Sequence, residues 1–134
     1  MSEIITNKLT GKTAAGNVTI TSEGGAVTMQ LQQGVIKVWG NITHSSPVAI
    51  NDSLNTSSLT DYGTGDASPN YTNNMSNSNY SVASSAEKSA SHSSIFHNGG
   101  INPTTSKSGL ITGTALNTTT DAEFASYQIA GDLA

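Results

Sequence analysis

Chemistry in this chain would have to come from a few short stretches, of which Gly63-Thr64-Gly65-Asp66 looks most like a phosphate-binding loop. A dinucleotide fingerprint needs a third glycine three positions further on, at the start of a helix, but Ser68 stands there and Pro69 follows. The Walker pattern is not matched, and a calcium loop would need alternating carboxylates and a closing glutamate. We therefore predict a glycine turn between two strands.

Histidines and carboxylates give two further candidates. His92 and His97 could bind a metal, yet their spacing places them on opposite faces of a strand, and no carboxylate lies within six residues of His97. Exposed loop histidines are expected, with a metal site on the symmetry axis of an oligomer as the alternative. Asp52, Asp61 and Asp66 have plausible separations for glycoside hydrolysis, but each lies in a turn-like context. The G-x-S-x-G elbow of serine hydrolases is absent as well. The sequence therefore predicts no catalytic residue, no metal, no cofactor and no enzyme.

Composition defines the elements that would position any site. Ser, Thr and Asn make up 51 of the 134 residues, and Thr, Val and Ile recur in short runs, which favours an ordered β protein with a polar surface over disorder. The net charge is −4 with five lysines and no arginine, so we expect no nucleic-acid partner. No apolar run spans a membrane, and without cysteine the chain has neither disulfides nor thiolate metal sites.

The first 25 residues predict a short N-terminal β arm. Alternating apolar and polar residues around Gly11 and Gly16 indicate short strands that bury too little surface to be stable alone. We therefore expect residues 1–25 to attach to a partner, through the apolar side chains of Ile4, Ile5, Leu9, Val18 and Ile20.

Residues 26–134 predict one all-β domain, an antiparallel β-sandwich or a jelly-roll-like fold. Strands recur every ten to fifteen residues, and the most apolar of them, Val35 to Ile42, is expected to form a hairpin with Val27 to Leu31. Val35, Val38 and Trp39 are predicted core residues. Later strands are expected at Ser53 to Leu59, Ala67 to Tyr71, Asn79 to Ala86, Ser94 to His97, Gly109 to Leu116 and Phe124 to Gly131.

Two details complete the domain. Pro69 cannot donate to a ladder, so its strand is expected at a sheet edge. Tyr62, Asn73, Asn74 and His97 are the candidate surface contacts, because amphipathic rings and amides are typical of surfaces that bind sugars or proteins.

The central run also resembles a known group of proteins. "GVIKVWGNIT", followed by "NDSLNTSSLTDYGTGD" and then by Met75 to Val82, is similar to small tail-fibre-like and other virion proteins of bacteriophages, especially marine ones. The chain departs from their pattern at Ala67 to Tyr71, where an apolar strand is usual. The resemblance implies a virion component with an all-β domain and trimeric assembly.

Two functions follow from this resemblance as expectations. The first is a tail-fibre-like appendage that docks to the particle through its arm and presents the β domain to the host surface, where a glycan or a protein is the partner. The alternative is a capsid or tail decoration protein with a purely architectural role. Other virion proteins and further copies of this chain, as a homotrimer, are the expected partners, and the expected location is the virion.

Overall fold

The computed structural model describes residues 4–12, 18–21, 25, 28–31, 34–87, 94–97, 101–113 and 118–134, with only the backbone given for 94–97. The chain divides into two compact units, Met1–Val35 and Ile36–Ala134. The boundary therefore falls after Val35, later than the predicted boundary after Gly25. The physical reason is a strand beyond Gly25 that pairs back onto the first unit.

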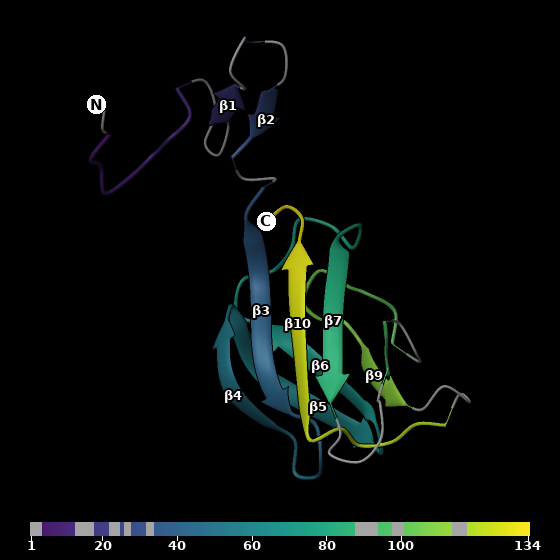
Figure 1. The fold of residues 1–134 in the computed structure, drawn as a ribbon. Coiled ribbons are helices and arrows are strands. Elements are labelled where there is room, and N and C mark those ends of the chain that lie inside the picture. The colour runs from purple at the N-terminus through teal and green to yellow at the C-terminus, as the bar shows by residue number, and fades with distance from the viewer. Residues whose placement is uncertain are drawn as a thin grey trace. The chain divides into compact units, whose positions relative to one another are not determined.

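The N-terminal unit contains one small antiparallel hairpin. Its strands are β1 (Thr19–Thr21) and β2 (Thr28–Gln30), and Ile20 lies opposite Met29 in the register. The pairing continues one step further, because the Leu31 N–H donates to the Val18 carbonyl at 2.7 Å. The expected hairpin between residues 27–31 and the next strand is therefore wrong: β2 pairs with β1 (Figure 1).

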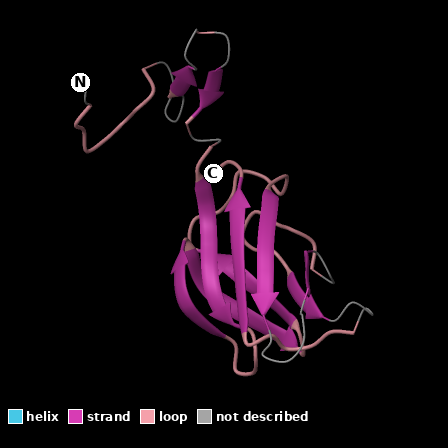
Figure 2. Cartoon of the chain, viewed as in Figure 1, coloured by secondary structure: helices cyan, strands magenta, loops and turns pink. Residues whose placement is uncertain are grey.

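The second unit is an antiparallel β-sandwich of two four-stranded sheets, as predicted (Figure 2). One sheet has the order β4-β3-β10-β7 and the other β5-β6-β9-β8. Figure 1 shows β3, β10 and β7 in one layer and β5, β6 and β9 in the other. The strands are β3 (Ile36–Thr43), β4 (Ala49–Leu54), β5 (Thr56–Gly63), β6 (Asp66–Tyr71), β7 (Ser81–Glu87), β8 (Ser94–His97), β9 (Leu110–Gly113) and β10 (Phe124–Ala130).

The chain crosses from the first sheet to the second at Asn55. This residue has a φ of 59°, a left-handed conformation that asparagine adopts more readily than most residues. Its amide holds the corner closed, since Asn55 Nδ2 donates to the Asn73 carbonyl at 3.0 Å. The strand expected from Ser53 to Leu59 is thus two strands in different sheets, because the backbone turns sharply between them.

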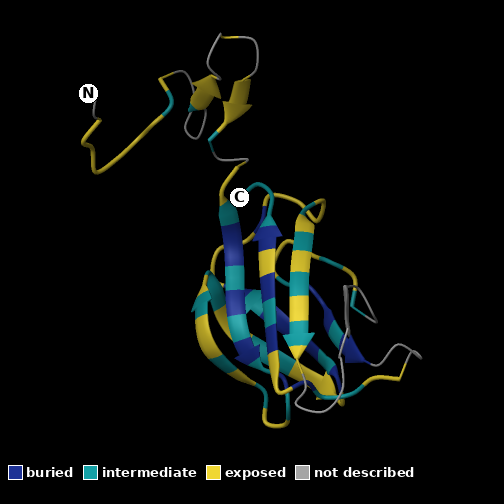
Figure 3. Cartoon of the chain, viewed as in Figure 1, coloured by how far each residue is buried: buried dark blue, intermediate teal, exposed yellow. Residues whose placement is uncertain are grey.

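The core lies between the two sheets and follows the period-two alternation of the strands. Figure 3 shows this alternation of buried and exposed residues along β10 and of half-buried and exposed residues along β7. Tyr127 is the largest fully buried side chain, and its hydroxyl lies 2.7 Å from Thr56 Oγ1 on the opposite sheet. The buried cluster comprises Val38, Ile42, Tyr71, Met75, Leu110, Ala125, Tyr127 and Ile129.

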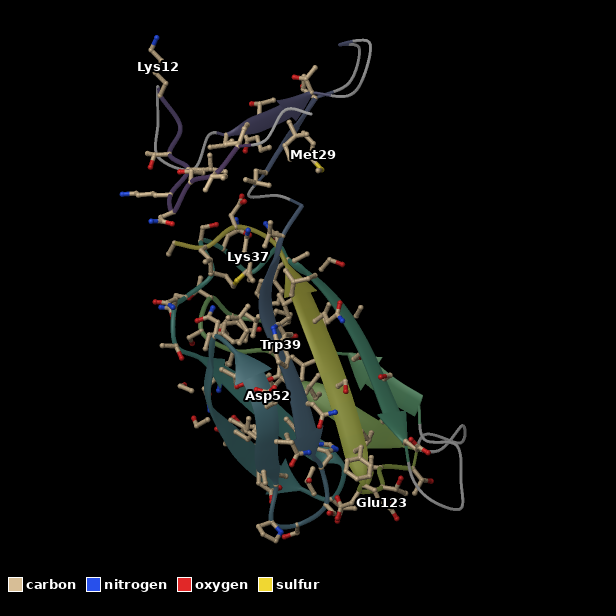
Figure 4. The ribbon with its side chains drawn as sticks, turned by 60° about the vertical axis from the view of Figure 1, so that its left-hand side comes forward. Lys12, Met29, Lys37, Trp39, Asp52 and Glu123 are labelled. Carbon is tan, nitrogen blue, oxygen red and sulfur yellow. The ribbon has the colours of Figure 1, made fainter. Side chains whose placement is uncertain are left out.

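Two of the three predicted core residues lie elsewhere. Val38 is fully buried, but Val35 is 47% exposed because it precedes β3 and belongs to the first unit. Trp39 is only partly buried: it neighbours Val38 on β3 and therefore faces the opposite side of the sheet. There it pairs with Leu54 on β4 and Gln128 on β10. Figure 4 labels its side chain on β3.

The strand that contains Pro69 is also placed differently. β6 lies between β5 and β9, not at an edge, and Pro69 is buried. The β6–β9 ladder pairs Ala67 with Leu110 and then breaks before an isolated bridge between Asn70 and Lys107. Within this break the Ser68 hydroxyl donates to the Ser108 carbonyl at 2.7 Å, so a side chain supplies a hydrogen bond where the proline has no N–H to donate.

Gly40 is expected to be essential for the packing of Tyr127. The two residues face each other across β3 and β10, and a Cβ at position 40 would overlap the Tyr127 ring and hydroxyl. Gly40→Ala should therefore lower the free energy of unfolding by about 1–3 kcal/mol through overpacking. Chemical denaturation measures this loss, and Gly40→Ala combined with Tyr127→Leu should recover part of the overpacking cost. A single variant as stable as the parent would contradict this account of the core.

Candidate functional site

The predicted surface contacts do not form one site. Tyr62 is 47% exposed on β5, where its hydroxyl accepts a hydrogen bond from Lys107 Nζ at 3.2 Å and the ammonium lies 5.9 Å from the ring centroid. Asn73 and Asn74 are exposed beside Asn55, at the other end of β5. A strand of this length separates the two groups by about 20 Å. The side chain of His97, and all of His92, lie outside the described residues.

The outer face of the first sheet carries an ordered row of polar side chains. Thr43 donates to Asn51, Asn51 donates to Asn41, and Asn41 donates to Ser126, with distances from 3.0 to 3.3 Å. A hollow of about 380 Å³ adjoins this row, lined by Asn41, Ser85 and the 51% exposed Phe124, among others. Hydroxyls, amides and rings of this kind suit contact with a neutral polar partner.

The predicted arm residues are mostly uncovered. Ile4 and Ile5 are 86% and 85% exposed, and Leu9 and Ile20 are 58% and 47% exposed. Only Val18 is partly buried. Figure 4 shows the side chains of Lys12 and Met29, which also belong to this unit. The unit therefore presents large apolar side chains with few of them packed together.

A group of ionisable residues that was not predicted lies around the buried His44. This histidine follows β3 and is 1% exposed. A cavity of about 210 Å³ lies beside it, where the β3–β4 loop, the β5–β6 turn and the segment before β10 meet. The cavity is lined by His44, Ser46, Val48, Asp61, Gly63, Thr64 and Asp121.

Hydrogen bonds define which nitrogen of His44 carries the proton. Thr112 Oγ1 donates its only hydrogen to the Thr120 carbonyl at 2.5 Å. The same oxygen lies 2.9 Å from His44 Nδ1, so it must accept from Nδ1–H. In the neutral ring Nε2 is then an unprotonated acceptor, and this atom is buried with no hydrogen-bond partner in the protein.

Gly65 joins the turn to its neighbours. It has a φ of +69°, and a Cβ there would meet the backbone of Thr112 and Thr120, so glycine is required for both reasons. Its N–H donates to Asp121 Oδ1 at 2.6 Å, and its carbonyl accepts from the Thr112 N–H at 2.8 Å. The predicted glycine turn is therefore present, and it brings Asp61 and Asp66 towards His44.

The surroundings shift the pKa values of this group in opposite directions. Burial lowers the pKa of His44 below 6.5, and the carboxylates of Asp121, Asp61 and Asp66 oppose that shift only in part. Burial raises the pKa of Asp66 above 3.8; His44 lowers it and Asp61 adds to the rise. At neutral pH the imidazole is therefore neutral, and Asp61 and Asp121 line the cavity with no lysine beside them.

Sequence reasoning missed His44 because no local pattern marks it. The histidine, the two aspartates of the turn and Asp121 are far apart in the chain and come together only through the order of the strands. The one available signal was a histidine directly after the most apolar strand, where loop residues reach the end of the sandwich.

Comparison with known proteins gives no match to any family model, curated protein or solved structure. The described residues contain no helix that could cross a membrane. Function has to be inferred from the residues and their contacts.

Stability is expected to fall as the pH drops below 6.5, because of His44. Its pKa is lowered in the folded protein, so below 6.5 the unfolded chain binds a proton that the folded state takes up only at lower pH. The raised pKa of Asp66 acts oppositely: its buried charge is unfavourable at neutral pH, and that cost is relieved as the carboxyl becomes protonated in acid. Between pH 7.5 and 5.5 the histidine effect should dominate.

Thermal unfolding at these two pH values provides the measurement. The parent protein should lose more stability on acidification than His44→Asn. His97→Asn is the control, because it removes a different histidine and should lose as much stability as the parent. An equal loss in the parent and in His44→Asn would show that His44 is not responsible.

Proposed function

We propose that the chain is a non-enzymatic structural protein of a bacteriophage virion, a tail-fibre-like appendage. Its N-terminal unit docks to the particle, and its β-sandwich faces the host surface. The resemblance of residues 51–66, "NDSLNTSSLTDYGTGD", to phage virion proteins supports the virion assignment. The attachment role is supported by a difference between the two units: the N-terminal unit leaves large apolar side chains exposed, whereas the sandwich buries a hydrophobic cluster.

Exposure of apolar side chains in Met1–Val35 is the observation that carries the proposal. Two three-residue strands provide almost no surface against which these side chains could pack. Covering one aliphatic side chain fully contributes about 1.5–3 kcal/mol, so a partner surface would gain substantially from covering several. The exposed residues are Ile4 at 86%, Ile5 at 85%, Leu9 at 58%, Met29 at 49%, Ile20 at 47% and Val35 at 47%.

A matched pair of variants tests the attachment role. Ile4→Asn combined with Ile5→Asn and Leu9→Asn removes apolar contacts from the arm, whereas Leu54→Asn changes a 48% exposed leucine of the sandwich. Neither change should alter the melting temperature of the purified protein, because none of these side chains is buried. Only the arm variant should be lost from particles, as measured by mass spectrometry of purified virions.

Normal incorporation of the arm variant would contradict attachment through this unit. Copy number per particle, measured by the same method, separates the two architectural roles. A small multiple of the tail symmetry supports the appendage, and a number that follows the capsid lattice supports a decoration protein instead.

The appendage is proposed to be a homotrimer. The outermost strands β4, β5, β7 and β8 contain no lysine, the residue that commonly keeps an exposed edge from pairing with another chain. β5 and β7 are rich in Ser and Thr, which can meet across a symmetry axis at a low desolvation cost, and each of these strands carries a single carboxylate. These edges are therefore suited to contact with other copies.

Light scattering on the full-length protein measures the assembly. We expect a mass three times the 13.7 kDa of one chain at micromolar concentration. A mass near 13.7 kDa would refute self-assembly and leave only oligomerisation imposed by the particle.

A further inference from the structure

We propose that the cavity beside His44 binds the guanidinium group of an arginine side chain presented by another protein. This inference does not depend on attachment through the N-terminal unit, because every lining residue belongs to Ile36–Ala134.

The cavity offers acceptors and negative charge. His44 Nε2 is an unprotonated acceptor without a partner in the protein, in a side chain that is 99% buried by its 1% exposure. Asp61 and Asp121 each use Oδ1 to accept a backbone N–H, at 2.9 and 2.6 Å, and an ionised carboxylate has capacity for further hydrogen bonds. No lysine lines the cavity, so a complementary ligand must bring both the donors and the positive charge.

Unpartnered atoms concentrate in this corner. Among the described residues, the buried side-chain polar atoms without a partner are His44 Nε2, Asp66 Oδ1, Thr120 Oγ1 and Ser108 Oγ. Thr120 is linked to His44 through Thr112, and Asp66 follows Gly65 in the nearby turn, but of these residues only His44 lines the cavity. Buried polar atoms are normally paired, so His44 Nε2 is the acceptor that an external donor at the cavity would satisfy.

The spacing of these groups favours an extended cation over a compact one. No three His, Asp or Glu side chains in the described part of the chain are placed to hold one metal ion. A guanidinium is a planar fork with five N–H donors, so it can reach acceptors that lie too far apart to share a single ion. The cavity volume of about 210 Å³ suits a group of this size, and Val48 provides an apolar wall for its stem.

The source of the arginine follows from the sequence. This chain contains none, so the guanidinium must come from a different protein and not from another copy. Charge-assisted, bidentate hydrogen bonds between a guanidinium and a carboxylate are strong, and their fixed geometry makes them specific.

Nuclear magnetic resonance on the full-length protein tests the proposal with N-acetyl-arginine amide as the probe. We expect saturable shifts, at millimolar probe concentration, of the amides of Gly63, Thr64 and Gly65 and of the His44 Nε2 resonance. N-acetyl-citrulline amide, which has the same shape without the charge, should give no comparable shift. Equal responses to the two probes, or no response to either, would overturn the proposal.

Substitutions locate the binding. Asp61→Asn combined with Asp121→Asn keeps the Oδ1 acceptors of the two backbone N–H groups but removes the charge, so affinity should fall about tenfold or more. Asp52→Asn is the matched control, because Asp52 also accepts a backbone N–H in the sandwich, from Ser53 at 2.8 Å, but lies outside the cavity. Undiminished binding by the double variant would place the arginine elsewhere.

Discussion

The contact between Tyr127 and Gly40 is the constraint on which the sandwich depends. Only 34% of the chain is hydrophobic and 5% aromatic, so the core has few large side chains with which to fill the space between its sheets. Tyr127 on the central strand β10 is the largest fully buried side chain, and Gly40 on β3 leaves the room that its ring requires. Its hydroxyl then reaches Thr56 on the opposite sheet, so a single side chain both packs the core and joins the two layers.

Local pattern was enough to predict the fold class and most of the strands. Alternation placed strands at Ala67 to Tyr71 and Ser94 to His97, close to β6 and β8, because period-two alternation is a property of neighbouring residues. The same reasoning misplaced Trp39, since a continuous apolar run does not show which face of a strand is turned inward. Val38 and Trp39 could not both point into one core.

Features set by distant partners could not be predicted. Pro69 argued for an edge strand, yet β6 is central: it pairs with β5 and with β9, and near the proline the Ser68 hydroxyl donates to the Ser108 carbonyl, forty positions along the chain. The β1–β2 hairpin was missed because β2 pairs with the preceding strand, β1, and not with the following strand, β3. The group around His44 is the extreme case, since it joins three segments that share no motif and meet only at the end of the sandwich.

The two units also separate two kinds of surface. In the N-terminal unit several large apolar side chains are exposed, which suits burial against a partner that excludes water. In the sandwich the exposed side chains are mainly hydroxyls and amides, and many are already hydrogen-bonded to each other, as in the row from Thr43 to Ser126. A surface of that kind remains soluble with few charges, because its polar groups are satisfied both by water and by their neighbours.

The His44 corner differs from both surfaces, because it contains buried polar atoms without a partner, His44 Nε2 and Asp66 Oδ1 among them. Leaving a buried donor or acceptor unsatisfied costs about 1–3 kcal/mol, and a domain of this size has only about 5–15 kcal/mol of net stability. His44 Nε2 and Asp66 Oδ1 together would therefore remove a large share of that stability. Both atoms are almost completely shielded from solvent, so water in the neighbouring cavity does not relieve this cost while the protein keeps this conformation. A ligand in the cavity would therefore meet the Asp121 carboxylate, which the Gly65 N–H holds in place, and would reach His44 Nε2 only after a small movement of the side chains that cover it.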